Sequence, residues 1–205
     1  FDKEAIKKFF KVNGDVFVRT FLLTLVTTFF TFVSAKMGDM ILAANALLMQ
    51  FFMLFSYFMD GFAYAGEALT GRYIGAQNHF LLKSMLRRLF FWGFIVSAVS
   101  AVVYIFFPSQ ILHILTNDLE VINTTKTFIT WTVLIPITGF AAFLWDGIFI
   151  GATASKEMRN AMIFSSITFF ASYYIATPIL GNNGLWLSFI LYLAVLRSRN
   201  SALPS

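Results

Sequence analysis

The chain has 205 residues, of which 59% are hydrophobic and only 12% are charged, and its formal net charge is +5. A soluble domain carries about 25% charged residues, so this composition excludes an ordinary water-soluble globule and indicates a protein of the lipid bilayer. The lack of cysteine excludes disulfides and thiolate sites, and His79 and His113 lie far apart with no acidic cluster beside them, so we expect no metal and no cofactor.

Apolar runs of about 20 residues, long enough to cross a hydrocarbon core of about 30 Å, predict an all-α polytopic membrane protein with six transmembrane helices. In chain order they cover residues 16–35, 40–70, 89–107, 127–145, 160–178 and 184–196. The last two share one charge-free run, which we expect to break at "TPILGNNG", because proline removes a hydrogen-bond donor and glycine and asparagine favour turns.

These helices predict one six-helix unit over residues 1–197, followed by a tail at 198–205. The last helix is shorter than a full span, and the chain starts without an initiator methionine. We therefore expect the sequence to be part of a longer protein.

Basic residues predict the orientation of the helices. If the N-terminus is cytoplasmic, 13 of the 15 Lys and Arg residues fall on the cytoplasmic side and only Lys36 and Lys126 fall outside. Cytoplasmic loops are the ones that carry an excess of Lys and Arg, so both ends of the chain are expected in the cytoplasm. This bias explains the positive net charge without a nucleic-acid partner.

The second helix ends in "FSYFMDGFAYAGEALTGRYIGAQN" (55–78), which holds two carboxylates with only Gly, Ala, Phe and Tyr between them. At 100° per residue, five polar side chains fall within an arc of about 100°. A polar stripe on a membrane helix is expected to face the bundle interior or a water-filled cavity, and the neighbouring small residues allow close helix contact. The stripe consists of Gln50, Tyr57, Asp60, Tyr64 and Glu67.

Two interpretations of Asp60 and Glu67 stay open. In the first, the acids line a cavity and hold a proton or another cation as the cavity opens to each side. In the second, they lie at the inner end of the helix and pair with Arg72, Lys83 or Arg87. The second interpretation suits Glu67 better, since Glu67 lies nearer the membrane interface.

Asp146 ends the charge-free fourth helix and is a further candidate. It is either a second acid of the same cavity or an interfacial residue near Lys156. Its segment "WDGIFIGA" echoes "MDGFAYAG" around Asp60. No arrangement of serine, histidine and acid and no phosphate-binding loop is readable in the sequence, so we expect no enzyme activity. An intramembrane hydrolase would need two acids facing each other, such as Asp60 and Asp146.

Three stretches resemble the multidrug and toxic compound extrusion (MATE) family, in its DinF-like branch. "ILAANALLMQFFMLFSYFMDGFAYAGEALTGRYIGAQN" (41–78) looks like the family's eighth helix, and "WDGIFIGATASKEMRNAM" (145–162) resembles the loop between its tenth and eleventh helices. "NNGLWLSFILYLAVLR" (182–197) is similar to the start of its twelfth.

The resemblance implies the C-terminal lobe, helices seven to twelve, of a twelve-helix transporter built from two six-helix lobes. Such proteins export cationic, amphiphilic drugs in exchange for H⁺ or Na⁺ by alternating access. It also implies a bacterial inner membrane and a missing N-terminal lobe as partner. In this branch, an aspartate of that absent lobe is thought to take up the proton that drives export. The acid that couples proton uptake to export is therefore not carried over to this chain.

Two other functions stay open. A flippase of lipid-linked oligosaccharide in the same superfamily would need a cationic cavity for pyrophosphate, whereas the acids here favour cationic substrates. A non-transporting membrane scaffold would hold the acid stripe in fixed ion pairs.

Overall fold

The computed structural model describes residues 3–200, and this part of the chain folds into eight α-helices and no strand. The all-helical prediction is confirmed. Five of the helices are long and apolar enough to cross a membrane: α1 from Val12 onward, α2, α3, α6 and α7. The elements are α1 (Lys3–Lys36), α2 (Asp39–Gly75), α3 (His79–Phe106), α4 (Pro108–Leu115), α5 (Leu119–Thr127), α6 (Ile129–Gly151), α7 (Ser155–Leu180) and α8 (Asn182–Asn200).

Most helices run beyond the apolar stretches that predict them. The third helix begins at His79 rather than at 89, because the Asn78 side chain accepts a hydrogen bond from the backbone N–H of Leu81 (3.0 Å) and caps it. The basic turns that follow stay helical. The sixth helix, expected over 184–196, covers Asn182–Asn200 and so includes the start of the expected tail, while residues 201–205 lie outside the described residues.

The segment between the third and fourth predicted helices is not a plain loop. It contains two short helices, α4 and α5. Pro108 begins α4, and the Asp118 carboxylate accepts hydrogen bonds from the N–H groups of Glu120 (2.9 Å) and Val121 (3.2 Å) at the start of α5. These are the usual positions of a helix-initiating proline and an N-cap aspartate.

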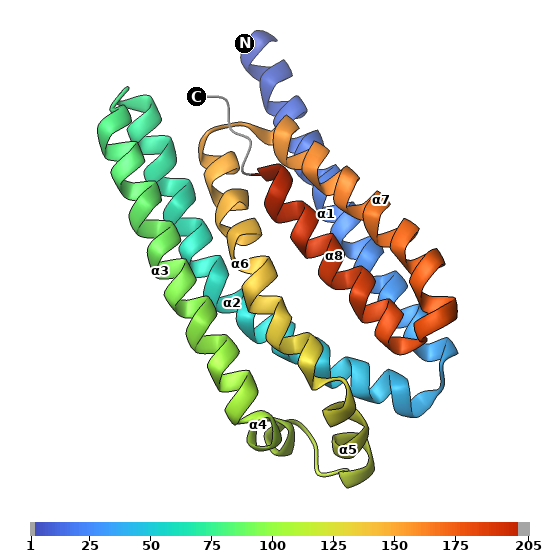
Figure 1. Ribbon diagram of the computed structural model, residues 1–205. Helices are drawn as coiled ribbons and strands as arrows, with labels where there is room; N and C mark the ends of the chain where they lie inside the picture. The colour runs from blue at the N-terminus through green and yellow to red at the C-terminus, as the bar shows by residue number, and fades with distance from the viewer. Residues whose placement is uncertain (1–2, 201–205) are drawn as a thin grey trace.

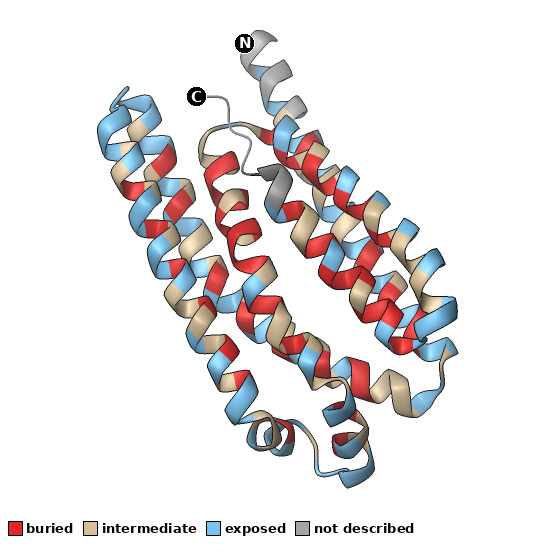
Figure 2. Ribbon diagram, in the orientation of Figure 1, coloured by how far each residue is buried: buried red, intermediate tan, exposed pale blue. Residues whose placement is uncertain are grey.

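Helix α6 is the central element of the bundle. Figure 1 shows α6 between α3 on one side and α8 on the other, and Figure 2 shows buried residues along much of its length. In its most apolar 18-residue window 61% of residues are buried, against at most 28% in the other four candidate spans. A second dense region joins α1 and α8, where Phe30 packs edge-on against Trp186 at 4.9 Å between ring centroids.

The closest helix contact lies between α6 and α2. A Cβ atom added to Gly147 would lie 2.0 Å from the carbonyl oxygen of Ala63, and one added to Gly151 would lie 2.3 Å from that of Glu67. Only glycine permits this approach. The sequence predicted close contacts from the small residues of α2, and these occur at Gly66, where a Cβ would lie 2.9 Å from Leu89 Cδ2, whereas Gly61 meets no atom within 4 Å. The two similar segments "MDGFAYAG" and "WDGIFIGA" therefore pack against each other.

The ends of the bundle offer a test of the predicted orientation. Ala76 follows α2 and Asn117 lies between α4 and α5; both are exposed, and Figure 1 places these two turns at opposite ends of the molecule. This chain has no cysteine of its own. With any cysteine elsewhere in the protein removed, Asn117→Cys should react with a membrane-impermeant maleimide in intact cells, and Ala76→Cys only after permeabilisation. The reverse pattern would overturn a cytoplasmic N-terminus.

Candidate functional site: an acidic cavity with a buried ion pair

Side chains from five helices meet in a cavity of about 300 Å³. Helices α1, α2 and α6 supply its charged groups, and α7 and α8 complete the wall with Met162 and Tyr192. The Tyr192 hydroxyl donates to the sulfur of Met162 at 3.0 Å, so it is already held in place. The charged lining residues are Arg19, Asp60 and Asp146.

The centre of this site is an ion pair between α1 and α6. Arg19 Nη2 donates to Asp146 Oδ2, and Asp146 is only 7% exposed. Asp146 therefore lines the cavity, and its ion-pair partner is Arg19 rather than Lys156. Among the described residues, Arg19 Nε and Asp146 Oδ1 are buried without a hydrogen-bond partner. The pair thus retains unused hydrogen-bonding capacity inside the cavity.

Asp60 lines the same cavity from α2 and is half-buried. Within the described residues it forms no ion pair, so the alternative in which it pairs with Arg72, Lys83 or Arg87 is not realised. Arg19 interacts electrostatically with both carboxylates. One cation against two anions leaves a net charge of −1 when all three groups are ionised.

The remaining members of the predicted stripe separate in the structure. Tyr64 lines the acidic cavity, although it is 70% exposed. Gln50 lines a different cavity of about 190 Å³ beside Ser34. Tyr57 is 71% exposed, and neither it nor Glu67 is part of the lining of the acidic cavity. Only Asp60 and Tyr64 of the five therefore share this site with Asp146.

Besides the Asp15–Arg159 ion pair between α1 and α7, sequence reasoning missed two features that join distant helices. Arg19 was counted only as a basic residue for orientation, yet it is the partner of Asp146. Asn45 of α2 and Asn182 of α8 exchange side-chain hydrogen bonds of 2.7 and 3.0 Å, and Trp186 donates to Asn45 at 2.8 Å. The signal for the second feature was a lone asparagine inside an apolar helix, since buried amides need partners.

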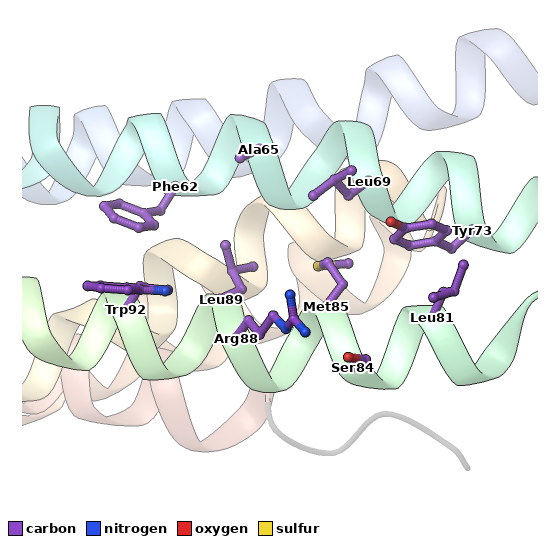
Figure 3. Close-up of a pocket in the computed structure, with 10 residues that line it drawn as sticks. All are labelled: Phe62, Ala65, Leu69, Tyr73, Leu81, Ser84, Met85, Arg88, Leu89 and Trp92. Atoms are coloured by element: carbon purple, nitrogen blue, oxygen red, sulfur yellow. The ribbon is translucent and has the colours of Figure 1, made fainter.

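A second groove lies between α2 and α3, with a volume of about 400 Å³. Figure 3 shows its apolar side chains, with Phe62 and Leu69 on α2 facing Trp92 and Leu89 on α3. Its one charged lining residue is Arg88. The groove contains no acid, so it differs in kind from the acidic cavity. No group of three His, Asp or Glu side chains in the described part of the chain is placed to hold a metal ion.

Comparison with known proteins agrees with this architecture. The MatE family model matches residues 16–175. The chain is 34% identical to DNA damage-inducible protein F of Escherichia coli K12 over 189 residues, which is 92% of this chain and 41% of that protein. It is 22% identical to Protein DETOXIFICATION 43 of Arabidopsis thaliana, again over 92% of this chain and over 36% of the plant protein. The chain thus spans less than half the length of these relatives.

Proposed function

This chain belongs to the MatE family, and from that premise we propose that it forms the C-terminal half of a secondary active efflux transporter. The proposed transporter exports cationic amphiphilic compounds across a bacterial inner membrane and takes up H⁺ or Na⁺ in exchange. An N-terminal half of similar size is its partner, in keeping with the 41% of the Escherichia coli relative that this chain covers. The two halves together give access to each side of the membrane in turn.

The observation that supports this proposal is the charge balance of the acidic cavity. Ionisable residues within a membrane segment are rare, and they commonly mark an ion or substrate path. Asp146 is neutralised by Arg19, whereas Asp60 is half-buried in the same cavity without an ion-pair partner among the described residues. The cavity therefore has one negative charge left to attract a proton, a sodium ion or a cationic substrate.

The same balance argues against the two alternatives. A flippase of a pyrophosphate-linked oligosaccharide needs a cavity with excess positive charge, and here one arginine faces two aspartates. A scaffold would hold its acids in fixed ion pairs, and Asp60 is in none within the described residues. No described feature of the cavity specifically supports a flippase or a scaffold.

Substitution of Asp60 tests the proposal. In the complete transporter, Asp60→Asn should lower the export of a cationic dye such as ethidium by about tenfold, because a loss of roughly 1.4 kcal/mol of interaction with the cation corresponds to that factor. It should also weaken the dependence of export on the pH or sodium gradient. Export from everted membrane vesicles is the measurement, with the amount of protein in the membrane determined in parallel.

Glu67→Gln is the matched control. It removes the same charge about two helical turns further along α2, at a residue outside the cavity lining. We expect it to keep both the rate and its ion dependence. If Asp60→Asn exports the dye with an unchanged pH and sodium profile, the Asp60 carboxylate has only a structural role.

A further inference from the structure

Side chains of α3, α6 and α8 line a groove along Trp145, and Figure 1 shows α6 between α3 and α8. One part, of about 680 Å³, lies against α3 and is lined by Lys83, Arg87 and Phe90 as well as Trp145. The other part, of about 700 Å³, reaches α8 at Arg197. Phe90 and Trp145 line both parts, so the two parts adjoin at these side chains.

The charges of this groove are unbalanced at its α3 end. Lys83 and Arg87 are exposed, and neither has an ion pair or a hydrogen bond within the described residues. Helix α3 has no acidic residue anywhere along its length. Arg197 differs from these two, because it donates to the backbone carbonyl of Ile137 at 3.3 Å and lies over the ring of Phe140 at 5.3 Å.

The floor of the groove is aromatic and apolar. The Trp145 ring lies 5.2 Å from that of Phe90 and stacks on Phe149 at 5.7 Å between centroids. Tryptophan is typical of the boundary between headgroups and acyl chains, and basic residues at the ends of membrane helices reach toward the headgroups. Because Arg197 is already held by Ile137 and Phe140, the cations without partners lie at the α3 end and the apolar floor lies beyond them, which is the order of a lipid's headgroup and chain.

We propose that this groove binds an anionic phospholipid, with its phosphate headgroup at Lys83 and Arg87 and an acyl chain along Phe90 and Trp145. The order of the charged and apolar parts of the groove fits this occupant. A packed protein helix would cover the aromatic floor but would leave two cations unbalanced unless it also carried acids. Clusters of basic residues beside membrane helices commonly bind acidic lipid headgroups.

The site is distinct from the acidic cavity. Trp145 and Asp146 are neighbours in sequence, yet Trp145 lines the groove and Asp146 the cavity. Their side chains leave α6 in directions about 100° apart. A lipid in the groove would therefore touch the helix that positions the ion pair without entering the transport site.

Quenching of Trp145 by brominated lipids tests the proposal. The complete transporter is placed in bilayers that contain phosphatidylglycerol or phosphatidylcholine with brominated chains, and the signal of Trp145 is isolated by subtraction of a Trp145→Phe variant. Each basic residue near a membrane surface favours an acidic lipid by about fivefold, so we expect phosphatidylglycerol to be preferred by up to about 25-fold. Lys83→Gln combined with Arg87→Gln should abolish the preference.

The matched control is Arg72→Gln combined with Arg88→Gln, which removes two cations from the same end of the bundle but outside the groove lining. This variant should keep most of the preference, because neither Arg72 nor Arg88 lines the groove in which the headgroup is proposed to bind. An equal loss in both double variants would overturn the proposal in favour of general surface charge. Equal quenching by the two lipids in the unaltered protein, or a preference that survives Lys83→Gln with Arg87→Gln, would overturn it as well.

Discussion

Gly147→Ala is expected to destabilise the bundle strongly, although it adds a single methyl group. That methyl would lie 2.0 Å from the carbonyl oxygen and 2.6 Å from the carbonyl carbon of Ala63, and backbone atoms have no rotamer with which to move aside. Overpacking costs about 1–3 kcal/mol when side chains can adjust, so we expect about 3 kcal/mol or more here. Thermal unfolding of the complete protein in detergent should show a midpoint lowered by roughly 10 °C.

Gly61→Ala is the matched control, because a Cβ at Gly61 meets no atom within 4 Å. Alanine is favoured over glycine inside a helix by about 1 kcal/mol, so this variant should unfold at the same temperature or slightly higher. Equal midpoints for the two variants would mean that α2 and α6 are not in backbone contact at Ala63.

Arg19→Met is expected to cost about 3–5 kcal/mol, because it leaves the buried carboxylate of Asp146 without its partner. Removal of both charges in Arg19→Met with Asp146→Leu should restore much of that loss, since an apolar pair of similar volume often replaces a buried ion pair at little cost. The midpoint of thermal unfolding measures both variants. Dye export should stay low in the double variant, since its cavity has lost two of three charges.

This combination separates folding from transport. If Arg19→Met is as stable as the unaltered protein, the ion pair contributes nothing to the fold. If the double variant is stable and exports normally, the Arg19–Asp146 pair is structural only, and the proposed role of the cavity would rest on Asp60 alone.

The sequence predicted the helices and two of the three cavity charges for local reasons. Apolar runs reveal membrane helices because the bilayer sets their length, and Asp60 and Asp146 stood out because acids are rare in such runs. Helix ends were predicted less well, since the basic turn around Lys83 continues α3 beyond the apolar run. Hydropathy measures composition, whereas the end of a helix depends on caps such as Asn78.

The partners of these residues were beyond sequence reasoning. Arg19 and Asp146 are 127 residues apart, and nothing in either segment identifies the other. The same applies to Gly147 and Ala63, whose contact depends on how α6 crosses α2. The small residues of α2 predicted that another helix approaches α2 closely. They did not predict that the glycines that permit this approach, Gly147 and Gly151, belong to α6.

The polar links of the bundle also affect its synthesis. Asp15 pairs with Arg159, Arg19 with Asp146 and Asn45 with Asn182, over separations of 144, 127 and 137 residues. At about 5–20 residues per second, a ribosome needs roughly 6 to 30 s to make the later member of each pair.

During that interval α1 and α2 hold an aspartate, an arginine and an asparagine whose partners do not yet exist. A charged residue at the centre of a lone membrane helix costs about 2.5–3.5 kcal/mol; Asp15 and Arg19 lie within the first eight residues of the span Val12–Lys36, so newly made α1 bears a part of that cost until its partners are made. The first helices of this chain are therefore expected to remain at the insertion machinery until α6, α7 and α8 emerge. A nascent chain stalled before α6 should still crosslink to that machinery through α1.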